Sequence, residues 1–359
     1  MMYNVKDFDA VKRNWRAFWN HEFIGRPYVL VTALKNGVTV EKKPETYVNK
    51  LKDARRGDFT TSVNDFVEVA KATMHYGESL PHYKADLCPD QYAAFYGAEV
   101  EARDGEYTTW IKAPVAEELC DLDLHLDLKS SPFLQMLEKA VRTAAEIADG
   151  NFIVHVPDYH SNLDALSALL SPQNLCYELM DNPELLEEKL AQINNDFDRI
   201  YKLFYEAGNM KQTGTLSWLN AYCEDKMSVI QCDFSCMMSP EQGLRYVIPS
   251  IEKELESIDR AIYHYDGKMA LCHFDNIMAI DRLDCIQWTP GAGQKRTIYW
   301  MDLLKKVQAK GKSVWLRDWT PEEILADREL DPALTAFTLN LQSEAEAEDF
   351  MEKLEKKYR

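Results

Sequence analysis

The sequence lacks an excess of positive charge, and it also lacks long apolar runs. Its 41 Lys and Arg residues stand against 59 Asp and Glu residues, which gives a net charge of −18 over 359 residues. A surface of that sign repels phosphate groups, so nucleic acids and anionic membranes are poor partners. No apolar stretch approaches the roughly 18 residues that a membrane helix requires, and no signal-peptide pattern opens the chain. We therefore expect a soluble, cytoplasmic protein.

Cysteine pairs and the common catalytic motifs are also missing. The chain has eight cysteines but no Cys-x-x-Cys pair, which predicts free thiols in a reducing compartment. Five cysteines are either buried small side chains or thiolate metal ligands: Cys223, Cys232, Cys236, Cys272 and Cys285. The sequence has no Gly-x-Gly-x-x-Gly after a strand, no P-loop, no Gly-x-Ser-x-Gly and no His-Glu-x-x-His. Dinucleotide-binding, nucleotide-hydrolysing and serine-hydrolase functions therefore have little support.

What the sequence does have is a regular alternation of β-rich runs and amphipathic helices. No Gly-, Ser- or Pro-rich linker interrupts it, so residues 1–359 are interpreted as one domain, with 1–27 as an N-terminal helical extension. A helix is expected over 61–76, and a hairpin over 98–102 and 107–111. Eight short strands are expected at 28–33, 152–156, 213–219, 228–233, 261–265, 285–288, 313–316 and 336–340. We predict an α/β fold, a single (β/α)8 TIM barrel with N-terminal helical and hairpin additions; a doubly wound open sheet is the alternative.

Functional groups of such barrels gather where the strands end. The clearest example is the segment of His264 and Asp266, which share a face by alternation and are followed by Gly267, a residue that permits a tight turn. Two interpretations compete. The pair is an imidazole oriented by a carboxylate for acid/base catalysis, or it supplies two ligands of a Zn²⁺ ion.

A second strand end carries Gln231 and Asp233 on one face and Cys232 on the other. An amide and a carboxylate directed into a barrel are costly unless something binds them. Asp233 as a helix N-cap is the alternative, but Ser239 followed by Pro240 already supplies that cap. We therefore group Asp233 with His264 and Asp266 as the predicted catalytic residues.

Two further strand ends and one tryptophan complete the predicted site. Asp158 and His160 follow one strand, and Asp158 or Asp164 could instead cap the next helix. The loop of residues 290–293 could hold an anion or be a simple turn. The predicted substrate-binding residues are Gln231, Asp158, His160, Gln287, Trp288 and Trp218.

Three of these segments, residues 231–240, 263–267 and 286–293, resemble the uroporphyrinogen decarboxylase-like superfamily. They look most like its uncharacterised branch, which is grouped with corrinoid-dependent methyltransferases and cobalamin-independent methionine synthase. Residues 110–114 and 158–164 follow in matching order, so the resemblance extends over most of the chain from Phe8 onward. It implies a TIM barrel with its cleft at the C-terminal ends of the strands, and it suggests a homodimer.

The resemblance carries fold better than function. Authentic uroporphyrinogen decarboxylases open with an arginine-rich motif that meets the substrate's carboxylates, and the stretch from Arg13 to Trp19 lacks it. The methyltransferase branch holds zinc with His-x-Cys and a later cysteine. Here Asp266 stands in place of the first cysteine, and no cysteine follows Cys285. A harder N/O zinc site on His264 and Asp266 remains, completed by His155, His160, Asp158 or Asp233.

The leading hypothesis is therefore a methyltransferase that demethylates a small methoxylated or methylamine-like compound. A corrinoid protein supplied in trans would accept the methyl group. The alternatives are an acid/base lyase, decarboxylase or hydrolase acting on a small polar or sugar-like ligand, and a non-catalytic binding barrel.

Overall fold

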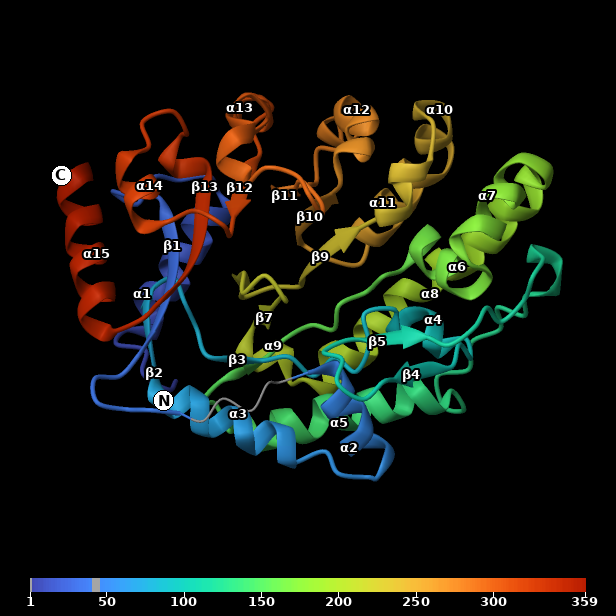
Figure 1. Cartoon of the computed structure of the whole chain (residues 1–359), viewed down its shortest axis with the longest axis horizontal. Coiled ribbons are helices and arrows are strands. Elements are labelled where there is room, and N and C mark those ends of the chain that lie inside the picture. The colour runs from blue at the N-terminus through green and yellow to red at the C-terminus, as the bar shows by residue number, and fades with distance from the viewer. Residues whose placement is uncertain (1, 41–45) are drawn as a thin grey trace.

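A mostly parallel sheet of seven strands forms the centre of the protein (Figure 1). The computed structural model describes residues 2–40 and 46–359. The sheet order is β2 (Thr73–Gly77), β1 (Tyr28–Leu34), β13 (Thr335–Leu341), β12 (Ser313–Leu316), β11 (Cys285–Thr289), β10 (Arg260–Asp266), β9 (Met227–Gln231). Every neighbouring pair is parallel except β1 and β2.

Two pairs of short strands continue the curve beyond β9. Strand β3 (His82–Tyr83) pairs in parallel with β6 (Ile153–Val154), and β7 (Thr215–Leu216) pairs with β8 (Tyr222–Cys223). The amide of Val156 donates to the carbonyl of Leu216 at 2.8 Å, which places β7 beside the end of β6. The path is barrel-like, but within the described residues the hydrogen-bonded sheet is not closed, because these strands are only two residues long. The expected α/β fold is thus confirmed as barrel-like, whereas the closed eight-stranded barrel stays a prediction.

The helices lie between the strands and cover their outer face (Figure 1). They are α1 (Phe8–Trp19), α2 (Tyr47–Arg55), α3 (Thr61–Ala72), α4 (Gln91–Phe95), α5 (Pro132–Ala148), α6 (Asn162–Leu170), α7 (Pro172–Asp181), α8 (Pro183–Ala207), α9 (Met210–Thr213), α10 (Pro240–Gln242), α11 (Ile248–Leu255), α12 (Phe274–Met278), α13 (Met301–Ala309), α14 (Pro321–Ala326) and α15 (Glu344–Tyr358). The predicted hairpin is present as β4 (Val100–Ala102) and β5 (Thr109–Ile111). None of the described helices is both long and apolar enough to cross a bilayer.

Strand alternation builds an apolar interior. One buried residue from each of eight strands joins a single cluster: Tyr28, Ile153, Leu216, Val229, Ile262, Cys285, Trp315 and Ala336. Helix α1 lies across the N-terminal ends of the strands, where Arg260 donates to the carbonyl of Trp19 at 2.9 Å. From there α1 directs large aromatic side chains into the interior. We call Trp15, Phe18, Trp19, Tyr28 and Trp315 the aromatic floor.

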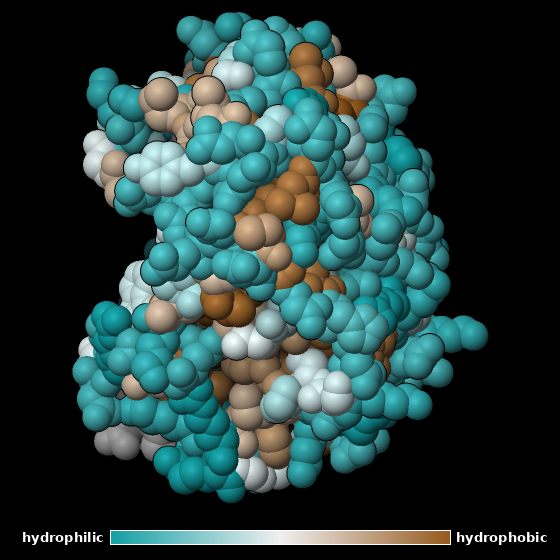
Figure 2. Space-filling view, turned by 90° about the vertical axis from the view of Figure 1, so that its right-hand side faces the viewer, coloured by the Kyte–Doolittle hydropathy of each residue, from teal (hydrophilic) through white to brown (hydrophobic). Residues whose placement is uncertain are grey.

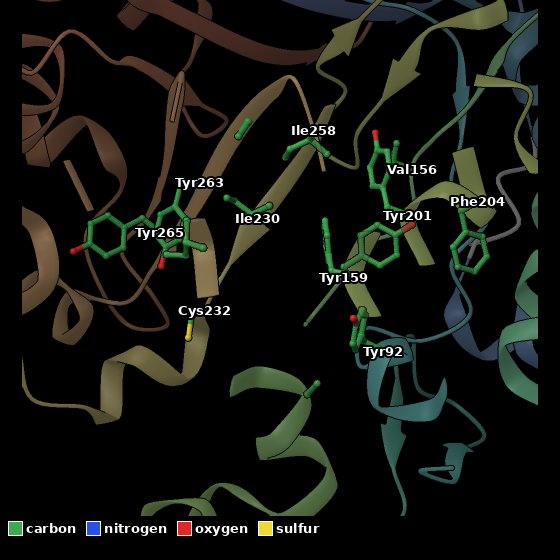
Figure 3. Close-up of a cluster of buried hydrophobic side chains, with 14 of the residues drawn as sticks. Tyr92, Val156, Tyr159, Tyr201, Phe204, Ile230, Cys232, Ile258, Tyr263 and Tyr265 are labelled. Atoms are coloured by element: carbon green, nitrogen blue, oxygen red, sulfur yellow. The ribbon is translucent and has the colours of Figure 1, made fainter. Parts of the chain in front are cut away.

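The outward-facing side chains of the same strands pack under the helices. Ile230 and Cys232 of one strand segment and Tyr263 and Tyr265 of the next belong to this second core, which Figure 3 shows together with tyrosines from the helical side. Cys232 is therefore a buried packing residue, because alternation turns it away from the interior that Gln231 faces.

Candidate functional site

Three polar side chains form a row above the aromatic floor. The strand register pairs His264 with Gln231 on one side and with Gln287 on the other. Each lies two residues after an inward-facing residue of the interior apolar cluster, and side chains two residues apart on a strand point the same way. The three polar side chains therefore also face inward. The row marks the C-terminal mouth of the interior, as the sequence predicts.

His264 is held in one orientation by this row. Its Nδ1 atom is hydrogen-bonded to Oε1 of Gln287, whose Nε2 donates to Oγ1 of Thr289 at 2.8 Å. Because the amide oxygen can only accept, the proton of the neutral imidazole lies on Nδ1, and Nε2 keeps its lone pair. Burial lowers the pKa of His264. The side chain is thus a neutral imidazole with a free Nε2.

Asp233 and Asp266 converge on this imidazole. One ligand atom from each of Asp233, His264 and Asp266 lies within 4.8 Å of the others. Among the residues that the structure describes, buried Oδ1 of Asp233 and Oδ1 of Asp266 have no hydrogen-bond partner, and neither amide atom of Gln231 has one. Buried polar atoms without partners are costly, so this group is built to bind something. Two carboxylates and an imidazole with an open position fit the N/O donor set of a catalytic Zn²⁺ site.

A second cluster shares Asp233 but has a different character. His160, Asp164 and Asp233 also offer atoms within 4.8 Å of one another. Nδ1 of His160 lies 3.4 Å from Oδ1 of Asp90, and its Nε2 lies 3.8 Å from Oδ2 of Asp158. Burial alone would lower the pKa of His160, but the surrounding carboxylates outweigh it and raise the pKa to about 10. His160 is therefore an imidazolium enclosed by acids, and it would have to release its proton to bind a metal ion.

Asp164 positions the loop that carries Asp233. Its carboxylate accepts hydrogen bonds from the backbone amides of Asp233, at 2.9 Å, and Phe234, at 2.8 Å. It makes these long-range bonds although it lies in the first turn of α6, so the expected alternative of a helix cap does not describe it. Burial raises the pKa of both Asp164 and Asp233.

The mouth also depends on a network that the sequence analysis missed. Asp86 and His155 are fully buried, with Oδ2 and Nε2 3.0 Å apart. Oδ1 of Asp86 accepts from Nε2 of Gln91 at 2.8 Å and from the amide of Asp158 at 3.1 Å. The network thereby positions Asp158. It also pairs His155 with Asp86, so His155 is not part of the His264 cluster. The alternation of polar His82, Lys84 and Asp86 with apolar neighbours is the signal that could have revealed it.

The two predicted tryptophans have different positions. Trp218 lies in the mouth, edge-on to His264 with 5.2 Å between ring centroids. Trp288 faces the other way, because it alternates with the inward-facing Gln287. It packs against Tyr265 at 5.7 Å and Trp300 at 5.2 Å, so the structure does not bring it to the site.

A cleft of about 560 Å³ connects the acidic cluster with the surface. His160, Asp164 and Asp233 line it, while Trp110 of β5 and Met237 form part of its apolar lining. Figure 2 shows the side of the molecule that carries α7 and the hairpin, with a mainly hydrophilic surface broken by apolar side chains. The cleft therefore combines an acidic interior with a partly apolar lining, which suits a small organic molecule.

Comparison with known proteins identifies a likeness of fold. No protein-family model matches the chain, and no curated protein matches it in sequence. Among solved structures, the chain is similar to a methyltransferase from Methanosarcina mazei, with a TM-score of 0.60 and 12% sequence identity. The match covers 97% of this chain and 99% of the other. At that identity the likeness establishes that the two chains share an overall fold over nearly their whole length.

Proposed function

We propose that the protein is a methyltransferase that removes a methyl group from a small methoxylated or methylamine-like compound. The observation that carries the proposal is the convergence of Asp233, His264 and Asp266, with unpartnered carboxylate oxygens, at the mouth of a fold shared with a methyltransferase. A corrinoid protein is the proposed acceptor, and the cleft of about 560 Å³ is its route to the substrate.

The residues divide the work as follows. Asp233, Asp266 and Nε2 of His264 would hold a zinc ion, which as a Lewis acid would polarise the oxygen or nitrogen that bears the methyl group. Gln287 keeps the His264 proton on Nδ1, and Asp164 holds the backbone of Asp233 in place. Transfer would break the bond between the methyl carbon and that heteroatom, which keeps the bonding electron pair, and the methyl carbon would form its new bond with the electron pair of the Co(I) of the corrinoid acceptor. Hard oxygen and nitrogen ligands suit this substrate type better than a soft thiol.

Metal content tests the centre independently of activity. The full-length protein should carry one zinc per chain by elemental analysis, and Co²⁺ in its place should give a visible absorption band. Asp266→Asn should abolish stoichiometric zinc. The matched control is Asp275→Asn, an exposed acid nine residues further on. Glu118→Gln tests the exposed Glu118, Cys120 and Asp121 group as an incidental metal site. Zinc that follows Glu118, or full zinc in Asp266→Asn, would overturn the proposed centre.

Methyl transfer itself is tested with cob(I)alamin as surrogate acceptor and a panel of methoxylated and N-methylated compounds. The expected result is conversion of the Co(I) absorption spectrum to that of methylcobalamin, lost in His264→Ala and after chelation. Activity that survives chelation would overturn the metal-dependent mechanism. No conversion with any compound would overturn methyl transfer.

The second candidate is acid/base chemistry on a small polar or sugar-like ligand. Burial raises the pKa of Asp233 to about 6, and this favours it, because a carboxyl group with a pKa near the working pH can exchange a proton with a ligand. It predicts turnover of such a ligand by metal-free protein, and a loss of that turnover in Asp233→Asn.

A further inference from the structure

The mouth contains two cationic side chains, Lys84 and Arg317, beside Trp218. Lys84 follows β3, and Arg317 follows the last residue of β12. The Lys84 ammonium and the Arg317 guanidinium each lie 5.9 Å from the ring centroid of Trp218. Trp218 in turn contacts His264. Two cations from different strands thus meet at one aromatic ring beside the proposed metal ligands.

Neither cation is in direct contact with a protein carboxylate among the described residues, although Lys84 is close enough to act electrostatically on Asp86 and Asp158. In the part of the chain that the structure describes, neither Lys84 nor Arg317 forms an ion pair within 4.0 Å, and neither side chain donates a hydrogen bond. Arg26, Arg260 and Arg296, by contrast, are each paired with an acid: Glu78, Asp284 and Glu323.

Two polar atoms near these cations also lack hydrogen-bond partners among the described residues. Nε1 of Trp218 is buried and has no partner, and the same holds for Oγ1 of Thr338. Leu316 pairs with Phe337, so the next residues along both strands, Arg317 and Thr338, come side by side. Ammonium, guanidinium and indole N–H groups can only donate hydrogen bonds. A ligand that satisfies all of them presents acceptors, and two positive charges select an anion.

We propose that Lys84, Arg317 and Trp218 form a subsite for the anionic end of a small organic molecule. The inference rests on the proposed function in one respect, that this molecule is the methyl donor. Its carboxylate or a similar group binds at Trp218, and its methylated heteroatom faces the Asp233, His264 and Asp266 cluster. The contact of Trp218 with His264 keeps the two groups a few bonds apart. The substrate class is thus a small methoxy or methylamino acid.

Equilibrium binding tests this subsite without turnover. Isothermal titration calorimetry on the full-length, zinc-loaded protein at low salt compares 2-methoxyacetate with its neutral counterpart 2-methoxyacetamide. We expect methoxyacetate to bind at least tenfold more tightly. Lys84→Met and Arg317→Met should each weaken its binding by at least tenfold and leave the amide unchanged, whereas Lys84→Arg and Arg317→Lys should retain most of the affinity.

Lys226→Met is the matched control. Lys226 is half-buried, as Lys84 is, and it lies 5.7 Å from the ring centroid of Tyr205, but it precedes β9 and so lies at the end of the strand away from the mouth. It should change methoxyacetate binding by less than twofold. Thermal unfolding of each variant checks that it folds, and the retained affinity of Lys84→Arg and Arg317→Lys distinguishes lost charge from lost structure.

The outcomes separate the subsite from the proposed function. Equal binding of acid and amide, or acid binding that is insensitive to Lys84 and Arg317, overturns the subsite even if neutral methoxy compounds are demethylated. Binding that is lost in Asp266→Asn but not in Lys84→Met assigns the anion to the metal and also overturns it. Charge-dependent binding without methyl transfer supports the subsite and overturns the function.

Discussion

The two ends of the strand-lined interior are made by the same strands but differ in their side chains: one end is packed with aromatic rings, and the other carries buried acids. At the floor, Trp15 stacks on Trp315 at 5.9 Å with 12° between the rings, and its indole N–H donates to the carbonyl of Glu78 at 3.0 Å. At the mouth, carboxylate oxygens of Asp233 and Asp266 are buried without partners. The floor is mainly apolar, and its one unpartnered polar atom among the described residues is the indole nitrogen of Trp315, whereas the unpartnered atoms of the mouth include carboxylate oxygens.

This difference separates stability from function within one core. Apolar burial at the floor stabilises the fold. Buried acids at the mouth cost free energy, and sites with such strain are where binding and catalysis are found. Substitutions at the floor should therefore unfold the protein, while substitutions at the mouth should remove ligands with little loss of stability, or even a gain. The predictions below test that separation, starting with the largest effect.

The floor should dominate stability. Trp15→Ala removes a side chain that is 1% exposed, together with its ring contacts and its hydrogen bond. We expect a loss of about 3–5 kcal/mol in the free energy of unfolding, measured by urea denaturation. Trp110→Ala is the control, because Trp110 is 47% exposed at the cleft and should cost less than about 1 kcal/mol. Similar losses in the two variants would contradict the proposed role of the floor.

A buried acid behind the mouth should make stability depend on pH. Glu254 is 1% exposed, and it accepts hydrogen bonds from Ser161 at 2.6 Å and from Asn162 at 2.8 Å. Burial raises its pKa from 4.5 to about 8. Since the folded state favours the protonated form, the stability this form provides is complete below about pH 4.5 and is lost as the pH rises through about 8.

Glu254→Gln keeps the shape of the protonated acid and removes that pH dependence. Its stability should match the wild type below about pH 4.5 and exceed it by about 3–5 kcal/mol at pH 8 and above, because a shift from 4.5 to about 8 at about 1.4 kcal/mol per pKa unit sets an upper limit of about 5 kcal/mol. Thermal unfolding across this range measures the difference. Glu252→Gln, on the same helix, is the control and should show no such trend. A constant difference between Glu254→Gln and wild type would mean that Glu254 is ionised throughout.

The acids of the mouth should exchange stability for metal binding. Burial is the main cause of the raised pKa of Asp233, and the nearby carboxylate of Asp266 raises it further. The two carboxylates therefore repel each other. Without metal, Asp266→Asn should therefore be more stable than wild type by about 0.5–1 kcal/mol. Added zinc should raise the melting temperature of the wild type and leave that of the variant unchanged. A variant that is less stable without metal, or that zinc stabilises equally, would contradict this account.

The sequence predicts the strands better than it predicts their environment. Period-two alternation locates all eight expected strand segments and the inward pairs Gln231 with Asp233 and His264 with Asp266, because side-chain direction follows directly from the backbone. The expected helix over 61–76 ends instead at Ala72. Thr73–Gly77 becomes β2 because antiparallel pairing with β1 satisfies its backbone groups, and that partner is more than thirty residues away.

The same limit applies to the site. The sequence places His155 among the possible metal ligands, yet its partner is Asp86, which lies 69 residues earlier. Lys84, Asp86 and Arg317 were missed because their significance depends on which strands meet. Trp288 is among the predicted substrate-binding residues because it closes the same strand as Gln287, although strand alternation turns these two side chains in opposite directions. Spacing along the chain predicts which way a side chain points, but only the fold determines which side chains become its neighbours.

The smallest expected effect on ligand binding concerns the two tryptophans, which face opposite sides of the strands: Trp288 is 2% exposed, and Trp218 is half-buried at the mouth. Trp288→Phe should lower the free energy of unfolding by about 1 kcal/mol through lost packing against Tyr265 and Trp300. It should leave methoxyacetate affinity within twofold, because the ring lies outside the mouth. Trp218→Phe should have the opposite balance: little change in stability and a threefold or greater loss of affinity, since it deletes the unpartnered indole N–H. Calorimetry and urea denaturation on both variants decide whether ligand binding follows the inner face of the strands.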